Sequence, residues 1–285
     1  MSAIASARLV PRRDMTYRYG PVRHFTTDVW VLIKRSIARI GREPETLADV
    51  TFLPVIFILM FAYVFGGAIV LPGSGSYHEY LIGGMLGMGL AQTAPGVAVA
   101  LVTDMSTGLI DRFRSLPMSR WAVLTARTLA ELVKQMISAV VVTCVGLAIG
   151  WRVHTRAIDV VAAFALALLV GYAFTWAGVC LGLALRSPEA AQQAGLIVFL
   201  PLTFISSAFV PTQGMPGWLR PVAEWNPMSA LASSCRHLFG NPDPAVAVRA
   251  WPMQHPELAV FCWSAGMLAL FAPLAVHLYR RKALN

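Results

Sequence analysis

The stretch VVAAFALALLVGYAFTWAGVCLGLAL, residues 160–185, runs for 26 residues without a Lys, Arg, Asp, Glu or His. A helix rises 1.5 Å per residue, so roughly 20 apolar residues cross a hydrocarbon core about 30 Å thick. This stretch is long enough to span a membrane, and it indicates that the chain is a membrane protein.

The composition supports the same conclusion for the whole chain. Of its 285 residues, 57% are apolar and 13% are charged, and the mean hydropathy is +0.63. No soluble fold of this size could hide so much apolar surface from water. These values exclude an intrinsically disordered chain, a disulfide scaffold and an ordinary cytosolic enzyme. The predicted fold class is an all-α polytopic membrane protein.

Five further apolar stretches approach the same length, which predicts six membrane spans in all. The six are residues 51–71, 80–102, 133–150, 160–185, 190–210 and 258–279. The third span is short, and we expect it to continue a helix that begins near Trp121. Between the fourth and fifth spans, Ser187 is placed to cap a helix and Pro188 to begin it, so these spans should form a hairpin.

The basic residues predict the orientation. Residues 1–26 form a polar tail without the apolar core of a signal peptide, and the transmembrane domain should cover residues 27–282. Residues 27–43 combine apolar positions at helical spacing with four basic residues, which predicts a helix on the membrane surface that ends at Pro44. Eighteen of the 23 Lys and Arg residues fall on the side that holds both termini. The chain is therefore expected in the cytoplasmic membrane with both termini in the cytoplasm.

The external segment, residues 211–256, is too structured in sequence for a plain connector. Asn226-Pro227 opens an apolar run, so the segment should hold one or two short helices. Trp218 and Trp225 are expected at the membrane interface.

The search for catalytic chemistry finds no candidate. The sequence has no His pair at i, i+4, and its four cysteines lack metal-ligand spacing, so no metal site or catalytic residue is predicted. A P-loop requires Gly-x-x-x-x-Gly-Lys-Ser/Thr, and none of the three lysines follows a Gly. The net charge of +9 lies in short loops between apolar runs, which argues against nucleic-acid binding.

Two classes of transporter stay open at this point. An ion-coupled carrier usually places a titratable side chain at mid-membrane, and five of the six spans lack one in their central turns. A secondary, ion-coupled multidrug transporter is thereby disfavoured but not excluded, because unwound backbone can also bind an ion. The uncharged polar residues within the spans indicate either hydrogen bonds between helices or a mildly polar path for an amphiphile. Gly178 and Gly182 predict close helix contacts, within one chain or with a second copy.

The cytoplasmic segment 104–120, between the second and third spans, holds the most distinctive pattern, GLIDRFRSLP at residues 108–117. Gly108 and Pro117 bound a short predicted helix that carries both charges and an apolar ridge. The pattern fits a helix that docks into a groove of a soluble partner, and it equally fits a basic loop whose aromatic residue rests on the headgroups.

The stretch Asp111-Arg112-Phe113-Arg114-Ser115-Leu116-Pro117 resembles the signature of the ABC-2 type exporter permeases of the daunorubicin and multidrug resistance kind. The resemblance extends over roughly residues 25–282 in order and spacing. Further matching stretches are Phe65-Gly66-Gly67, Pro201-Leu202-Thr203-Phe204-Ile205-Ser206-Ser207, Pro216-Gly217-Trp218-Leu219 and Asn226-Pro227. One departure is Ile82-Gly83-Gly84, where the family commonly has a Pro before the second Gly, so the resemblance does not extend to a kink at that point.

The resemblance implies a permease that exports a hydrophobic or amphipathic compound such as a drug, an antibiotic or a lipid-like product. It implies that residues 27–43 form a connecting helix, residues 108–117 a coupling helix and residues 215–239 external helices that cap the path. Two copies, or this chain and a homologous permease, would pair in the lipid bilayer. A separate soluble ATPase, which would hold ATP and Mg, would dock beneath each.

The same resemblance assigns two sets of candidate residues. The ATPase-coupling set is Gly108, Asp111, Arg112, Phe113, Arg114, Ser115 and Pro117. The substrate path would run between the second and fifth spans of two copies, and its candidates are Gln92, Thr93, Thr203, Phe204, Ser206 and Ser207.

Overall fold

The computed structural model describes residues 44–67, 69, 71, 76–106, 120–243 and 248–282. Within these residues every regular element is helical and none is a strand, which confirms the all-α fold class. The elements are α2 (Pro44–Leu59), the π-helical turn η1 (Met60–Phe65), α3 (Tyr77–Ala91), α4 (Thr93–Ser106), α6 (Arg120–Ala148), α7 (Ala157–Ala184), α8 (Pro188–Phe204), the 3₁₀ turn η2 (Thr212–Gly214), α9 (Arg220–Glu224), α10 (Pro227–Phe239), α11 (Trp251–Gln254) and α12 (Pro256–Lys282). The predicted tail 1–26, connecting helix 27–43 and coupling helix 108–117 lie outside the described residues.

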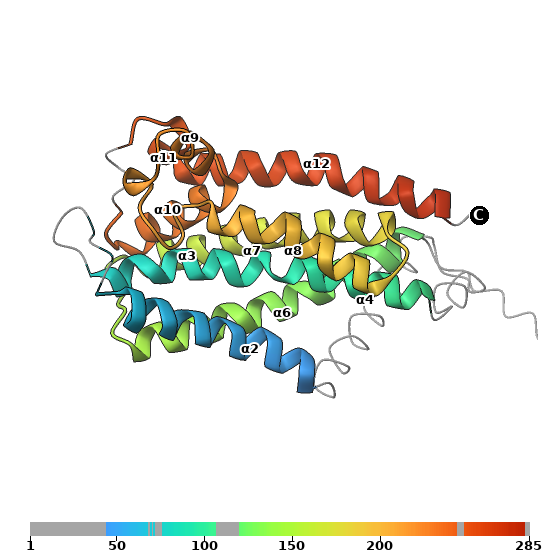
Figure 1. Cartoon of the computed structure of the whole chain (residues 1–285), viewed down its shortest axis with the longest axis horizontal. Helices are drawn as coiled ribbons and strands as arrows, with labels where there is room; N and C mark the ends of the chain where they lie inside the picture. The colour runs from blue at the N-terminus through green and yellow to red at the C-terminus, as the bar shows by residue number, and fades with distance from the viewer. Residues whose placement is uncertain are drawn as a thin grey trace, which may run out of the picture.

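The long helices run side by side, and α9, α10 and α11 gather at one end of the bundle (Figure 1). We call this the α10 end. At the opposite end α4 finishes and α6 begins, and we call this the α4–α6 end. The helix pairs that pack together fit this arrangement, since α10 contacts α3, α7 and α12.

Four helical stretches are long and apolar enough to cross a membrane. They are Tyr77–Ser106, Arg127–Ala148, Ala157–Ala184 and Pro256–Tyr279, and Thr51–Phe65 is a shorter apolar helix. α8 has 17 residues and so covers about 26 Å, somewhat less than a hydrocarbon core. The count of six spans therefore stays a prediction.

The third predicted span is confirmed as part of a longer helix, since α6 begins at Arg120, directly before Trp121. The turn between α7 and α8 is also as predicted. The Ser187 hydroxyl accepts a hydrogen bond from the Ala190 backbone N–H at 3.2 Å, and Pro188 is the first helical residue. The N–H at the first helical position has no partner within the helix, and Pro lacks this N–H, so α8 begins at Pro188 without losing a hydrogen bond.

The second predicted span is broken at Gln92, between α3 and α4. Pro95 has no N–H, so the Ala91 carbonyl has no helical donor four residues further along. The Thr93 hydroxyl caps the end of α3 by donating to the Leu90 carbonyl at 2.7 Å. α3 is unbroken at the Gly-Gly pair where the sequence departs from the family pattern.

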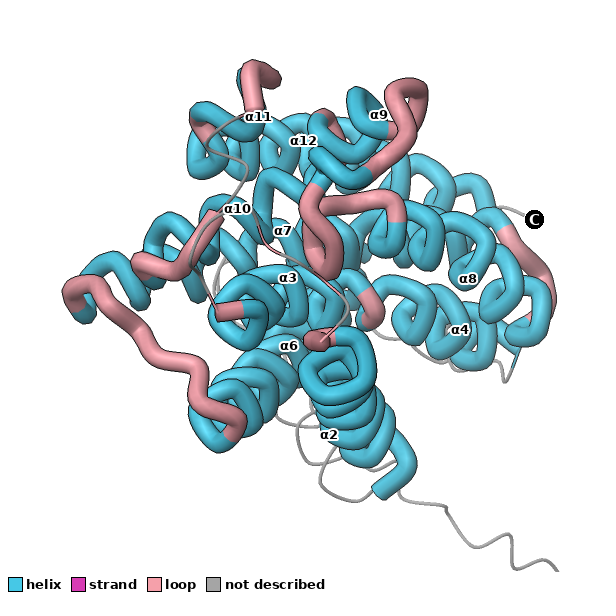
Figure 2. The backbone as a smooth tube through the Cα atoms, turned by 60° about the vertical axis from the view of Figure 1, so that its left-hand side comes forward, coloured by secondary structure: helices cyan, strands magenta, loops and turns pink. Residues whose placement is uncertain are grey.

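α4 packs closely on α7 and α8. A Cβ atom on Gly178 would lie 2.3 Å from the Ala94 oxygen, and one on Gly182 would lie 2.7 Å from the Ala98 oxygen. Only glycine permits this approach, so the predicted small-residue contact is made within one chain. In the end-on view α4 lies beside α8, while α6 lies beside α2 and α3 (Figure 2).

Candidate functional site

The apolar run predicted as the fifth span, 190–210, is helical only as far as Phe204. Residues 205–210 follow without helical structure, and we call them the 205–210 segment. Irregular backbone at membrane depth is tolerated only where its polar groups are satisfied by the protein. The partners of this segment therefore decide whether it can be stable.

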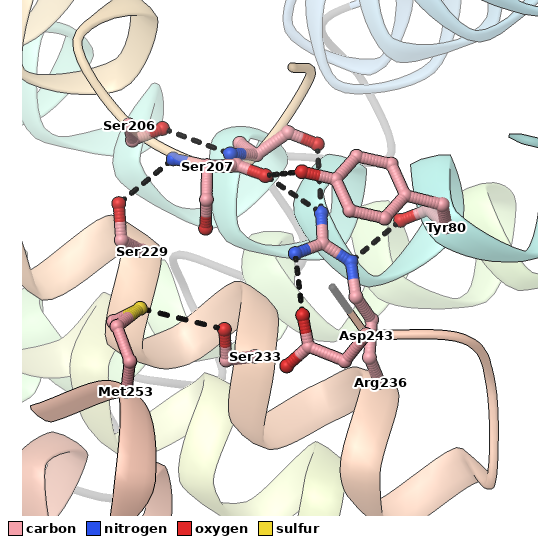
Figure 3. Close-up of polar contacts among 9 residues, drawn as sticks. Tyr80, Ser206, Ser207, Ser229, Ser233, Arg236, Asp243 and Met253 are labelled. Atoms are coloured by element: carbon pink, nitrogen blue, oxygen red, sulfur yellow. Dashed lines mark hydrogen bonds and ion pairs between the residues drawn. The ribbon is translucent and has the colours of Figure 1, made fainter. Parts of the chain in front are cut away.

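Side chains of α3 and α10 bind the carbonyl groups of the segment. Arg236 of α10 donates from Nη2 to the carbonyl oxygen of Ser207 at 2.8 Å and to that of Ala208 at 3.1 Å. Its Nε donates to the Tyr80 carbonyl at 2.8 Å, while the Tyr80 hydroxyl donates to the Ser207 carbonyl oxygen at 2.6 Å (Figure 3). One arginine thus joins the 205–210 segment, α3 and α10.

Two further side chains extend this arrangement on either side. The Tyr77 hydroxyl of α3 donates to the Phe209 oxygen at 3.1 Å. The Asn226 amide donates to the Leu202 oxygen at 2.7 Å and to the Ile205 oxygen at 2.6 Å. In a continuing helix the carbonyl of residue 202 would accept from the N–H of residue 206. Here it accepts from the Asn226 amide, and α8 ends.

The local sequence of α10 explains how its donors are aimed. Asn226 is the N-cap, and its side chain accepts from the Met228 N–H at 2.8 Å. Gly240 ends the helix with a φ of 70°, a left-handed conformation that favours glycine. Ser229 and Arg236 are seven residues apart and so lie on one face. The Ser229 hydroxyl accepts from the N–H of residue 207 at 2.8 Å.

Arg236 is fully buried, with 0% of its surface exposed. Its Cζ lies 3.5 Å from the centroid of the Tyr80 ring, and its Nη1 lies 3.8 Å from an Asp243 carboxylate oxygen. A buried charge is stable only where it is paired and hydrogen-bonded, and here a carboxylate, an aromatic face and three carbonyls surround it. Nε and Nη2 make the hydrogen bonds, whereas Nη1 is near the carboxylate without a hydrogen bond among the described residues.

Two glycines of α3 make room for this cluster. A Cβ atom on Gly83 would lie 2.8 Å from Arg236 Cγ, and one on Gly84 would lie 2.0 Å from the Ala208 oxygen. The Gly-Gly pair therefore allows the 205–210 segment and α10 to approach the backbone of α3.

Four of the predicted path residues lie at this end of α8. The Thr203 hydroxyl donates to the Phe199 carbonyl at 2.8 Å, and the Ser206 hydroxyl donates to the Thr203 carbonyl at 2.5 Å. Thr203, Ser206 and Ser207 are buried, whereas Phe204 is 42% exposed. Within a single chain only Phe204 faces outward, and the assignment of all four to a path stays a prediction.

The other two predicted path residues, Gln92 and Thr93, lie at the break between α3 and α4. The Gln135 amide of α6 donates to the Thr93 hydroxyl at 2.9 Å and to the Thr175 hydroxyl of α7 at 3.1 Å. Three helices therefore meet in a buried polar contact beside the break.

The two groups of path residues are not brought together. α4 meets α8 where Pro95 lies against Gly195, since a Cβ atom on that glycine would be 2.7 Å from the proline Cβ. Thr203 lies eight residues beyond Gly195, about 12 Å further along the helix. The groups therefore lie at different heights in the bundle.

All seven predicted ATPase-coupling residues, Gly108, Asp111, Arg112, Phe113, Arg114, Ser115 and Pro117, lie outside the described residues. The helices on either side of them are placed. Along α6, the ammonium of Lys134 lies 2.9 Å from a Glu131 carboxylate oxygen. Arg127 pairs with Asp104 at the end of α4.

Sequence reasoning missed the residues that organise the site. The charge count that predicts the orientation places Arg236 with the five Lys and Arg residues on the external side, although it lies inside an apolar run, which was a usable signal. Tyr77, Tyr80 and Gln135 gave no local signal. Among the described residues, no three His, Cys, Asp or Glu side chains gather closely enough to hold a metal ion.

Comparison with known proteins agrees with the family resemblance described from the sequence. Residues 27–239 match the ABC-2 type transporter family. A daunorubicin resistance ABC transporter permease protein of Streptomyces coeruleorubidus is 31% identical over 256 residues, covering 90% of this chain and 86% of that protein. A probable doxorubicin resistance ABC transporter permease protein of Mycobacterium tuberculosis is 26% identical over 265 residues, covering 91% and 90%. A putative transport permease of Porphyra purpurea is 24% identical over 219 residues, covering 76% and 75%.

Proposed function

Since the chain belongs to the ABC-2 type transporter family, we propose that it is the membrane-spanning permease subunit of an ATP-binding cassette exporter that moves a hydrophobic or amphipathic compound outward across the cytoplasmic membrane. The observation that carries the proposal is the family match over residues 27–239, together with similar permeases named for daunorubicin and doxorubicin resistance. A drug, an antibiotic or a lipid-like product is the proposed cargo.

We propose that a separate soluble ATPase supplies the energy. The 285 residues contain no P-loop, so ATP and Mg would be held by that partner. It would dock on residues 108–117 and act through Asp111, Arg112, Phe113 and Arg114. In support, the flanking helices α4 and α6 emerge at the same end of the bundle and are joined there by the Asp104–Arg127 ion pair.

We propose that two copies enclose the substrate path between α3 and α4 of one chain and α8 of the other. α8 carries a row of large apolar side chains that a single chain leaves exposed, such as Ile197 at 72% and Leu200 at 44%. Phe204 continues this row toward the α10 end. This face of α8 is therefore free to meet a second copy or lipid.

A reconstitution experiment tests the proposal. The chain and a candidate soluble ABC ATPase are co-purified and reconstituted in vesicles, and compound-stimulated ATP hydrolysis and transport are measured. We expect the double charge reversal Arg112→Glu/Arg114→Glu to abolish ATPase recruitment or export while membrane insertion is retained. The matched control is Arg249→Glu, which reverses an exposed charge on the predicted external side.

Two results would contradict the proposal. Normal export by the Arg112→Glu/Arg114→Glu variant would remove the coupling role from this segment. Transport that survives ATP depletion but collapses with an uncoupler would identify a secondary, ion-coupled transporter instead.

A further inference from the structure

A line of polar contacts joins α6 to α4 and α7 toward the α4–α6 end of the bundle. Arg127 of α6 pairs with Asp104 of α4. Eight residues further along α6, the Gln135 amide donates to Thr93 of α4 and to Thr175 of α7. We call this line the polar seam.

The α6 side of the seam is a buried polar face. Arg127, Glu131 and Gln135 follow one another at intervals of four residues, so they lie on the same side of the helix. Glu131 is 4% exposed and Gln135 is 0% exposed. Thr128, next to Arg127, is also buried, and its hydroxyl lies 3.4 Å from the Tyr172 hydroxyl of α7.

The contacts on either side of the seam are of a different kind. α4 is held by α7, α8 and α12 through apolar clusters, one of which includes Val97, Leu101 and Val179. Among the described residues, these two clusters contain no residue of α6, whereas a third cluster, on the α10 side of Gln135, joins Ala94 of α4 to Ala139 and Val142 of α6. α6 packs on α2 and α3, where Ile82 fills the space beside Gly146. On the α10 side of Gln135, α7 packs on α3 and α6 through apolar residues, so the seam separates α4, α7, α8 and α12 from α2, α3 and α6 only toward the α4–α6 end.

Close-packed contacts resist separation, because every pair of touching atoms loses its attraction when a gap forms. Hydrogen bonds and ion pairs tolerate separation better, because water or another polar group can replace either partner. A bundle that changes its packing should therefore part along the polar seam and not across the glycine contacts of α4 with α7.

Gln135 makes the closed seam less stable than a fully paired one. The Thr93 and Thr175 hydroxyls donate their single protons to the Leu90 and Gly171 carbonyls, so both can only accept from Gln135. Both amide N–H groups are thereby used, and Oε1 is buried without a hydrogen-bond partner among the described residues. An unpaired buried acceptor is costly, and opening the seam to water would satisfy it.

We propose that the chain opens along the polar seam during the transport cycle, with the break at Gln92 as the hinge. α3 and α4 lie on opposite sides of the seam and are joined at this break, where the helical hydrogen bonds are already interrupted. At the α10 end the two groups stay fastened, because α10 contacts both α3 and α7. Opening therefore takes place at the α4–α6 end, and this inference rests on the proposed function as an ATPase-driven permease.

Two cysteine positions on α7 test the opening. Thr175 and Val179 lie one turn apart and are both 0% exposed, but the first lines the seam and the second lies in the apolar cluster around α4. Thr175→Cys or Val179→Cys is introduced into a chain whose four native cysteines are replaced. The chain is reconstituted with its ATPase, and a membrane-impermeant thiol reagent is added from the ATPase side. During ATP hydrolysis we expect Thr175→Cys to react about tenfold faster than without nucleotide, and Val179→Cys to keep its rate.

A charge reversal tests the seam without nucleotide. Arg127→Asp faces Asp104 with a like charge, so it should raise the labelling of Thr175→Cys in the absence of ATP. Adding Asp104→Arg restores an opposite-charge pair and should return the labelling to its original rate. The amount of folded protein and its melting temperature, measured alongside, separate opening of the seam from general unfolding, which would expose Val179→Cys as well.

The outcomes are distinct. If the complex transports while the labelling rate of Thr175→Cys stays as low as that of Val179→Cys, the proposed opening is wrong. It is also wrong if ATP hydrolysis accelerates labelling equally at both positions. A complex that neither hydrolyses ATP nor transports would refute the proposed function. In that case Arg127→Asp still decides the inference, since unchanged labelling of Thr175→Cys in this variant would overturn it.

Discussion

Replacing Arg236 by Met is expected to detach the end of α8 from α3 and α10. The substitution keeps an apolar stem of similar length in the space above the Tyr80 ring and removes the guanidinium. The Asp243 carboxylate then loses its arginine, and the Tyr80 and Ala208 carbonyls lose the donors that Arg236 supplies. The Ser207 carbonyl keeps one donor, the Tyr80 hydroxyl.

The size of the effect follows from the burial of the pair. Removing one partner of a buried ion pair costs about 3–5 kcal/mol, because the group that remains loses the opposite charge that offsets its burial. The lost carbonyl hydrogen bonds are part of the same cost and are not added to it. At 1.4 kcal/mol for each factor of ten, the detached state should be populated about 10² to 10⁴ times more than in the unchanged protein.

Cysteine accessibility at Ser207, which is 2% exposed, measures this population. In a cysteine-free chain carrying Ser207→Cys, a membrane-impermeant maleimide is added from the predicted external side. Where detachment is fast relative to labelling, the labelling rate follows the detached population, so Arg236→Met should accelerate it by a similar factor. Arg249→Met, at an exposed position, is the matched control and should leave the rate unchanged. A rate within about twofold of the control would refute the assignment of Arg236 as the residue that holds this segment.

Three further substitutions test single features of the bundle. Gly178→Ala should destabilise the detergent-purified protein by about 1–3 kcal/mol, because its Cβ would lie 2.3 Å from the Ala94 oxygen. The control Gly96→Ala, in the interior of α4, meets open space and should keep or slightly raise the melting temperature, because alanine favours a helix more than glycine does. Ser187→Ala removes the N-cap of α8 and should cost about 1 kcal/mol in the same melting assay. Pro95→Ala restores the missing N–H and should close the break beside it, so vesicle transport should fall while stability is retained. Full transport by this variant would contradict a hinge at the break.

The features that were predictable from the sequence are those with local causes. Helix positions follow from runs of apolar residues, and helix starts follow from caps such as Ser187-Pro188 and Asn226-Pro227, whose side chains bond to N–H groups two or three residues away. The small-residue spacing of Gly178 and Gly182 also predicted a close contact, although not which helix would fill it. Pro95 was a local signal for the broken span that length and hydropathy alone do not use.

The end of α8 had no comparable signal. The run 190–210 is apolar throughout most of its length, and Pro201, within the helix, does not end it. The helix stops because Asn226 takes the Leu202 carbonyl, a partner 24 residues away in the sequence. Arg236 was misread for a related reason. Counting charges assigns every Arg outside a span to a water-facing loop, whereas α10 buries this one completely.

The distances along the chain show why the site as a whole is less predictable than the helices. Arg236 and Tyr80 are separated by 156 positions, and the two tyrosines are separated from the carbonyls they bind, those of Phe209 and Ser207, by 132 and 127. Caps and periodicity connect residues within about four positions, so they cannot report such pairs. Irregular backbone in an apolar bundle requires distant polar side chains to satisfy it. Long-range polar contacts therefore concentrate where local rules predict an uninterrupted helix but the structure interrupts it. Among the described residues these interruptions are the break at Gln92 and the end of α8, and both include residues proposed for the substrate path.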